Sequence, residues 1–308
     1  MSTTQNFRPS RFAALAPAAV GLVLCIVAVE IRMDDPWAEG VLAFVAAVPA
    51  IGLLYLGLLA ARGDGASRAA VTIFLVGGLV LLAVAIFRLG RAFAGDDFLA
   101  GGGTLTWMLA LFTAVAAFCA SKARSAACLL IAALASVALL MEAVNWIFDA
   151  EDIDVFRVLL VLAFAALFAA GIAVSGRSGA VLVAAAGVSV LAGSYGTGIG
   201  LIFGASEALG WGWELITLLE GAALIAYAAQ RLEPGPAYLA FFILALFVVT
   251  AAAVGGGVGG GVVSDDGVVT ERSEDTHSLI GWPIALGLGT AAAALWGLRQ
   301  TAPERRAP

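Results

Sequence analysis

The sequence predicts an all-α, polytopic transmembrane helix bundle, and two observations support this fold class. The 308-residue chain is 62% hydrophobic and only 12% charged, with a mean hydropathy of +1.03. Soluble domains are nearer half apolar and a quarter charged. The apolar residues also fall in ten stretches, each close to the roughly 20 residues that a spanning helix needs. We therefore predict about ten spans.

The ten stretches follow one another along the whole chain. They are residues 12–31, 38–61, 69–90, 103–121, 125–147, 155–175, 179–199, 210–230, 236–255 and 279–298. No connection between them is long enough to hold a soluble domain. The sequence predicts one transmembrane domain, 12–298, between an N-terminal tail, 1–11, and a C-terminal tail, 299–308.

The charges between the stretches predict the orientation. With the N-terminus in the cytoplasm, eleven Arg and Lys residues lie in cytoplasmic segments and five outside, whereas sixteen Asp and Glu residues lie outside and three inside. Basic residues are enriched on the cytoplasmic side of membrane proteins. Six of the seven Trp residues fall at outer ends, where indole rings prefer the interface. We expect both termini and four short basic loops (ARGDGASR, SKARS, SGRSG, QRLEPGP) in the cytoplasm.

The composition also indicates where the protein resides and what it does not bind. Fifteen Arg against one Lys, with abundant Ala, Gly, Val and Leu, suggest a bacterial genome rich in GC. The first apolar stretch lacks a signal-peptide cleavage site, so we expect a retained helix in the bacterial cytoplasmic (inner) membrane. A net charge of −6 without basic runs argues against nucleic acid. The lipid bilayer is the expected partner, and the sequence does not define an oligomeric state.

Motifs for enzymatic or metal chemistry are weak. The tetrapeptide GRSG at 176–179 has the form used by intramembrane serine proteases, but the chain's single histidine, His277, is predicted on the opposite side of the membrane from Ser178. The three cysteines show no CxxC spacing, which argues against a metal knuckle or a disulfide framework. The acidic loop FDAEDIDVF could hold a hard cation or be a solvated loop. We expect no enzyme and no cofactor.

Ionisable residues inside the apolar stretches are the main pointers to function. Arg88, Glu142 and Glu214 are each predicted near the outer ends of their helices. An interfacial ion pair between Arg88 and Glu142 would offset the cost of leaving water, and snorkelling anchors are the alternative. Glu220 is predicted about 15 Å below the outer end of its helix, close to the bilayer midplane. A charged acid at that depth costs about 2.5–3.5 kcal/mol even on lenient scales.

Polar residues near Glu220 predict a substrate-binding or ion-binding site. On one helix face, Trp213, Thr217, Glu220, Leu224 and Tyr227 recur at helical spacing, and Glu214 lies three residues before Thr217. The preceding stretch ends in LAGSYGTGIGLIFG, where Ser194, Tyr195 and Thr197 lie among glycines that weaken a helix. Such interruptions are typical of transporter sites.

Two functions are consistent with this pattern. The first is a small-solute or ion transporter, with Glu220 carrying a proton. The second is a non-transporting membrane scaffold or a partner subunit of a membrane complex, in which a neutral Glu220 forms a hydrogen bond to a neighbouring helix.

Overall fold

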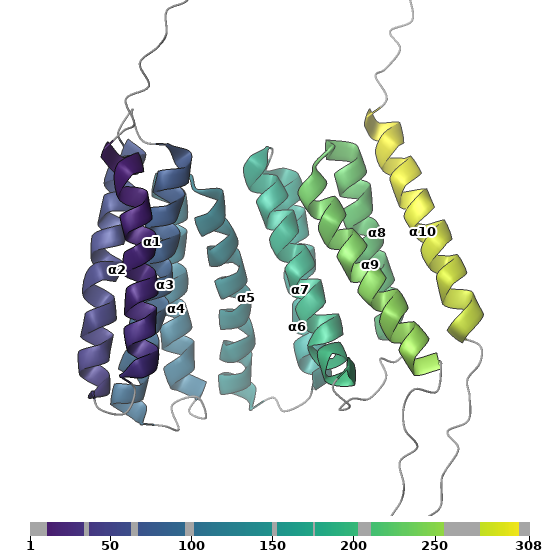
Figure 1. The fold of residues 1–308 in the computed structure, drawn as a ribbon. Helices are drawn as coiled ribbons and strands as arrows, with labels where there is room; N and C mark the ends of the chain where they lie inside the picture. The colour runs from purple at the N-terminus through teal and green to yellow at the C-terminus, as the bar shows by residue number, and fades with distance from the viewer. Residues whose placement is uncertain are drawn as a thin grey trace, which may run out of the picture. The chain divides into compact units, whose positions relative to one another are not determined.

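The computed structural model describes residues 11–33, 37–62, 67–95, 102–149, 153–174, 176–202, 211–255 and 278–301. These residues form ten α-helices, and none of them forms a strand (Figure 1). The helices are α1 (Arg11–Arg32), α2 (Glu39–Arg62), α3 (Arg68–Ala94), α4 (Gly102–Ala123), α5 (Ala126–Phe148), α6 (Ile153–Ala173), α7 (Arg177–Ile202), α8 (Trp211–Arg231), α9 (Pro234–Gly255) and α10 (Ser278–Thr301).

Each apolar stretch predicted from the sequence corresponds to one helix, so the helical fold class is confirmed. Capping residues explain several of the observed ends. Ser67 caps α3, and its hydroxyl accepts a hydrogen bond from the Ala70 amide at 3.2 Å. Ser125 caps α5 in the same way through the Cys128 amide, at 3.4 Å. Gly95, with φ of +71°, ends α3 four residues beyond the predicted position.

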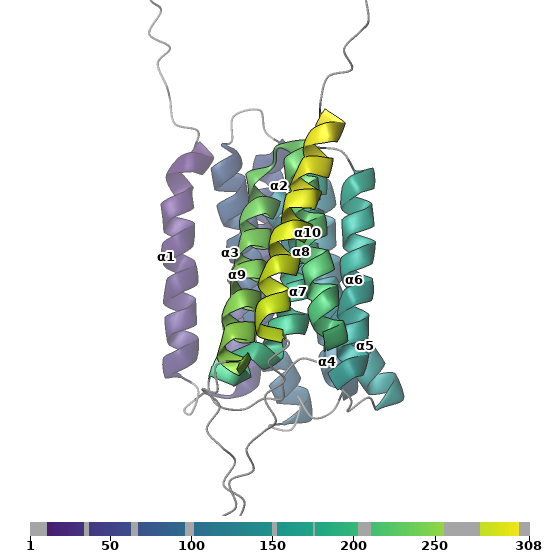
Figure 2. The same ribbon diagram turned by 90° about the vertical axis from the view of Figure 1, so that its right-hand side faces the viewer.

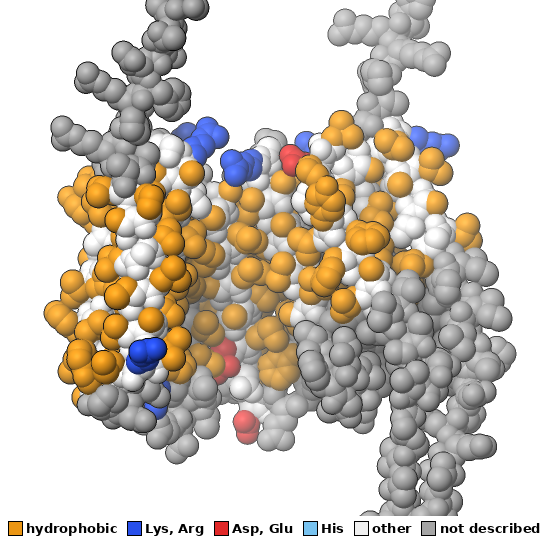
Figure 3. Space-filling view, in the orientation of Figure 1, with side chains coloured by type: hydrophobic (Ala, Val, Ile, Leu, Met, Phe, Trp, Pro, Cys, Tyr) orange, Lys and Arg blue, Asp and Glu red, His pale blue; other side chains and the backbone are white. Residues whose placement is uncertain are grey.

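Seven helices in the described part of the chain are long and apolar enough to cross a membrane, which is consistent with a helical membrane bundle. These seven segments lie in α1 to α6 and in α8. The described apolar segments of α7 and α9, Arg177–Ala192 and Pro234–Phe247, are shorter. Figure 3 shows hydrophobic side chains along the length of the described helices, with the charged side chains gathered toward helix ends.

The chain divides into two compact units, Met1–Asp152 with α1 to α5 and Ile153–Pro308 with α6 to α10. We call them unit 1 and unit 2 and describe each by itself. The single domain expected over 12–298 therefore stays a prediction.

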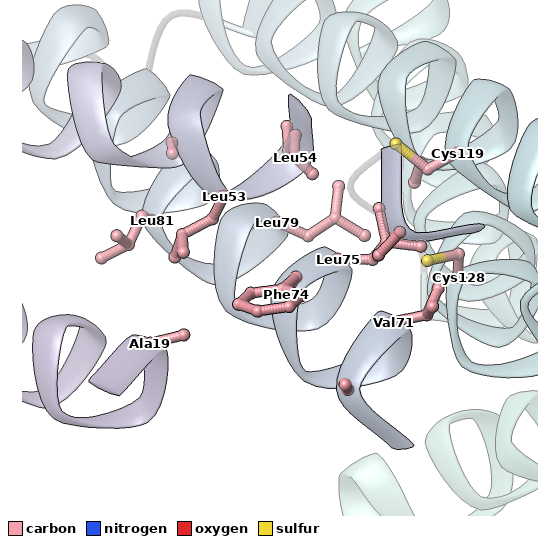
Figure 4. Packing of buried hydrophobic residues seen from close by; sticks show 14 of the residues in the cluster. Ala19, Leu53, Leu54, Val71, Phe74, Leu75, Leu79, Leu81, Cys119 and Cys128 are labelled. Carbon is pink, nitrogen blue, oxygen red and sulfur yellow. The ribbon is translucent and has the colours of Figure 1, made fainter. Parts of the chain in front are cut away.

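Unit 1 is built around α3, which contacts the other four helices of the unit. Figure 4 shows side chains of α3, including Phe74, Leu75 and Leu79, packed between residues of the neighbouring helices. Small residues let α2 and α3 approach closely. A Cβ atom built on Gly57 would lie 2.6 Å from Leu75 Cδ2, and one on Gly78 would lie 2.7 Å from Leu54 Cγ. Helices in lipid associate through such close packing, because burial of apolar surface gives no drive there.

Unit 2 consists of α6 to α10, whose ribbons face the viewer in Figure 2, and similar close contacts hold it together. In the α6–α7 hairpin, a Cβ atom on Gly171 would lie 2.5 Å from Val183 Cγ2. Helix α8 contacts α7, α9 and α10. A Cβ atom on Gly221 would lie 2.6 Å from Leu244 Cδ2 of α9, and one on Gly297 of α10 would lie 2.6 Å from the Ala226 carbonyl oxygen. The backbone of α8 is therefore in close contact with α9 and α10.

Candidate functional site

A small cavity lies within unit 2, where α6, α7 and α8 meet. The residues that line it are Arg157, Leu160, Val161, Ser189, Val190, Trp213, Ile216, Thr217 and Glu220. The space open to water within it is about 10 Å³. That volume is about the minimum that one water molecule needs. Residues with a carboxyl group, two hydroxyls, an indole ring and a guanidinium therefore line one cavity. The cavity has space for about one water molecule.

Glu220 is the buried acid of this cavity. It lies about 14 Å along α8 from Trp211, near the middle of the helix, and only 7% of the residue is exposed. None of the hydrogen bonds or ion pairs found among the described residues involves Glu220. Most buried polar side chains have a partner. Glu220 is therefore a mostly buried acid that lines a cavity and has no hydrogen-bond partner among the described residues, which makes it the main candidate for a functional group.

Thr217 and Ser189, which carry hydroxyl groups, also line this cavity. The Thr217 hydroxyl donates to the Trp213 carbonyl at 3.0 Å, and the Ser189 hydroxyl donates to the Ala185 carbonyl at 3.1 Å. Each hydrogen is thus directed to the residue's own helix, a common arrangement for Ser and Thr in spans. The oxygen lone pairs are acceptors, which suit a protonated carboxyl group or a water molecule.

Arg157 lines the same cavity from the second turn of α6. Its Nη1 atom lies 2.9 Å from Asp154 Oδ1, three residues earlier on the same helix. Its guanidinium carbon lies 5.8 Å from the centre of the Trp213 ring. That distance is within the range of a cation–π interaction. Apart from Glu220, Arg157 is the charged residue among the described lining residues.

The other predicted site residues have different surroundings. Glu214 is half-buried in the first turn of α8 and does not line the cavity. Tyr227 packs in the core of unit 2, with its ring centre 6.0 Å from that of Phe168 in an edge-to-face arrangement. It therefore belongs to the α6–α8 packing rather than to the cavity.

Residues 194–197 were predicted to lie in a weakened helix. Helix α7 instead continues without a break to Ile202, because glycine reduces helix stability without preventing helix formation. The side chains of Ser194, Tyr195 and Thr197 lie outside the described part of the chain, so their place in the site stays a prediction.

Two cavity residues, Ser189 and Arg157, were not singled out from the sequence. Ser189 lies about 18 Å along α7 from Arg177, which is close to the level of Glu220 about 16 Å from the Arg231 end of α8. A comparison of depth between neighbouring stretches would have identified it. Arg157 follows a run of acids and was assigned to an outer segment. The sequence therefore gave no reason to expect its side chain among the helices.

Unit 1 contains a second group of ionisable residues, built around Arg88 of α3. The Arg88 Nε atom lies 2.9 Å from Glu30 Oε2, and its Nη2 atom donates to the Glu30 carbonyl oxygen at 3.0 Å. Its Nη1 atom lies 3.2 Å from Glu39 Oε2. Glu39 also contacts Arg91, at 3.1 Å. We call Glu30, Glu39, Arg88 and Arg91 the Arg88 cluster. It joins α3 to α1 and α2 with two charges of each sign.

The expected partner of Arg88 is therefore corrected. Glu142 of α5 is not among the ion pairs of the described residues, and Arg88 contacts carboxylates of α1 and α2 instead. Depth along a helix predicted that Arg88 would pair near a helix end. It did not predict which neighbours would supply the carboxylates, because partner choice depends on how the helices pack around α3.

A larger hollow, of about 350 Å³, lies between α1 and α3. Its lining is apolar apart from Glu30 and Arg88, which bind one another. Ile31 and Phe87 in this lining are exposed on the helix surface. A hollow of this kind offers a solute few polar contacts, so we place the candidate site at Glu220.

Metal ligands do not gather in the described ranges: no three His, Cys, Asp or Glu side chains there are placed to hold an ion. Cys25 is exposed on α1, whereas Cys119 and Cys128 are buried, and none of the three forms a disulfide.

Comparison with protein families, curated proteins and solved structures gives no match for this chain. Its function is therefore argued from its own residues.

Proposed function

We propose that the protein is a bacterial inner-membrane transporter for a small solute or ion, in which Glu220 carries a proton. The single observation that carries this proposal is the position of Glu220: mid-helix, buried, without a described partner, and lining a cavity with Ser189 and Thr217. Ionisable residues at such depth typically mark ion or proton pathways.

The proposed topology has ten spans with both termini in the cytoplasm, as the loop charges predict. Each unit contains five helices among the described residues. An odd number of spans per unit would make α6 enter the membrane from the side opposite to α1. The Ile153 end of α6 and the Trp211 end of α8 would then lie at the outer surface, and Arg157 and Trp213 would lie between that surface and Glu220.

The size and charge of the cavity favour a proton over a larger guest at Glu220. The cavity holds about one water molecule. A proton needs no more space than that, because it binds covalently to the carboxyl oxygen. Arg157 also places a positive charge in the lining, which disfavours a second cation such as sodium.

Proton binding can be tested with purified protein in proteoliposomes on a solid-supported membrane. A rapid pH step should produce a charge displacement as protons reach the site. We expect Glu220→Gln to reduce this signal at least tenfold without loss of folding. Glu214→Gln is the matched control, since it makes the same change on the same helix outside the cavity lining, and it should retain the signal. An undiminished signal in Glu220→Gln would remove Glu220 from the mechanism.

The alternative proposal is a non-transporting scaffold or a partner subunit of a membrane complex. The small volume of the cavity favours it, since the described lining leaves no space for a solute. It requires Glu220 to act as a packing group through a hydrogen bond to another helix. If sustained pH-driven flux is absent across a panel of small solutes while the protein remains folded, this alternative is preferred.

A further inference from the structure

Arg157 pairs with one carboxyl group and lines the same cavity as another. Its ion pair is with Asp154, at 2.9 Å. Its side chain also lines the cavity that contains Glu220. One guanidinium therefore lies beside an acid at the end of α6 and shares a cavity with an acid in the middle of α8.

These two acids have different surroundings. The Asp154 side chain is 57% exposed, so water can replace the guanidinium when the pair separates, and exposed pairs of this spacing contribute little to stability. Glu220 is buried without a described partner. An ionised Glu220 is too buried for bulk water to take the place of a partner. A buried carboxylate is stabilised by a paired, hydrogen-bonded cation. The preferred partner of Arg157 should therefore depend on whether Glu220 holds its proton.

Trp213 lies beside the Arg157 guanidinium and lines the same cavity. The Arg157 guanidinium already lies 5.8 Å from the Trp213 ring centre. Trp213, Thr217 and Glu220 follow one another on one face of α8 and all line the cavity. Along the helix axes, Arg157 is about 6 Å from the start of α6 and Glu220 is about 14 Å from the start of α8. Both side chains also border the same cavity, which has space for about one water molecule.

We propose that Arg157 is an alternating counter-ion of Glu220, an inference that rests on the proposed role of Glu220 as a proton carrier. Arg157 pairs with Asp154 while Glu220 is protonated. When the O–H bond of Glu220 breaks, the proton passes to water, and the guanidinium donates hydrogen bonds to the carboxylate that remains. The guanidinium then occupies the place that a metal cation would take, so the site is specific for protons over sodium.

Other charged or titratable groups lie farther from the cavity. None of those described on the elements packed around Glu220 lines it; they are Arg177 of α7, Glu214, Tyr227 and Arg231 of α8, Tyr238 of α9 and Arg299 of α10. Among the described residues, Arg157 is therefore the cation best placed to respond to Glu220.

The inference can be tested by infrared difference titration of the purified protein in lipid bilayers. The carboxyl band of protonated Glu220 is assigned by its loss in Glu220→Gln. In Arg157→Gln, the pH at which half of this band disappears should rise by about one unit or more, because the carboxylate loses its partner. In Asp154→Asn it should fall, because the competing acid is gone. Arg157→Lys keeps the charge and should shift the midpoint less than Arg157→Gln.

Arg231→Gln is the control for loss of a positive charge, since Arg231 is on the same helix as Glu220 but away from the cavity. It should leave the midpoint in place, and so should exchange of potassium for sodium at constant ionic strength. An unchanged midpoint in Arg157→Gln, or an equal shift in Arg231→Gln, would overturn the inference. If Arg157→Gln does not fold, an unchanged midpoint in Asp154→Asn overturns it instead.

The titration separates this inference from the proposed function. Shifted midpoints without any pH-driven flux would reject transport and retain the counter-ion. Flux that depends on Glu220, with midpoints insensitive to Arg157 and Asp154, would retain transport and reject the counter-ion.

Discussion

Unit 1 and unit 2 bury ionisable side chains in different ways. In unit 1, the Arg88 guanidinium contacts two carboxylates and a backbone carbonyl, and its side chain is only 8% exposed. In unit 2, Glu220 is buried to a similar extent, yet no described residue pairs with it, and a cavity lies beside it. Arg88 joins three helices. Glu220 has no comparable structural role among the described contacts.

The difference shows how a structural charge can be distinguished from a functional one. Burial alone does not separate the two residues. Their partners do: Arg88 contacts carboxylates of α1 and α2, whereas no described residue pairs with Glu220, although one oxygen of the Arg88 cluster, Glu30 Oε1, also lacks a hydrogen-bond partner. Substitutions at the two places should therefore change stability in opposite directions.

Removal of the Arg88 charge should have the largest effect. Arg88→Met leaves Glu30 and Glu39 without their shared cation, and breaking a buried ion pair on one side costs about 3–5 kcal/mol. Unfolding by SDS in mixed micelles measures this loss. Arg68→Met, an exposed arginine at the start of the same helix, is the control and should change stability little. Equal stability of the two variants would show that the Arg88 cluster is not a structural support.

Replacement of Glu220 by Leu should have a smaller effect of the opposite sign. Because the carboxyl group has no described partner, its removal spares a desolvation cost of about 1–3 kcal/mol, and the protein should become more stable by a comparable amount. The same SDS unfolding series measures the gain. A loss of stability would show that Glu220 supports packing, as the scaffold alternative requires.

The Asp154–Arg157 pair in unit 2, in which the Asp154 side chain is 57% exposed, should have the smallest effect on stability. Asp154→Asn removes the ion pair with Arg157, but exposed pairs at this spacing contribute no more than about 0.5 kcal/mol. Thermal unfolding in detergent should therefore give nearly the wild-type midpoint, while the infrared titration of Glu220 shifts. A stability loss as large as that of Arg88→Met would contradict the distinction between the two ion pairs.

The sequence was sufficient for the helices but only partly for the site. Apolar run length predicts a helix because backbone groups in lipid must be paired within the segment, and all ten runs became helices. The depth and face of Glu220 and Thr217 followed from helical geometry alone. Both residues line the cavity as this geometry suggested.

The sequence did not predict which residues of different helices would contact one another. Arg88 was expected to contact Glu142, and it contacts Glu30 and Glu39, because α1 and α2 pack against α3 at that level. Tyr227 shares the helix face of Glu220 but lies about two turns away, where Phe168 of α6 packs against it. These contacts depend on the packing of whole helices, which no single stretch encodes.

The glycine contacts of unit 2 also define which parts can move. Gly221 and Gly297 place the α8 backbone against α9 and α10, and Gly171 places α6 tightly against α7. Sliding within either group would drive side chains into backbone. The cavity lies at the boundary between the two groups, but this boundary is also closely packed: a Cβ atom on Gly187 of α7 would lie 3.3 Å from Leu224 of α8 and 3.2 Å from Leu239 of α9. Wider access to Glu220 would therefore require the α6–α7 hairpin to separate from α8 and α9 and expose part of this shared core.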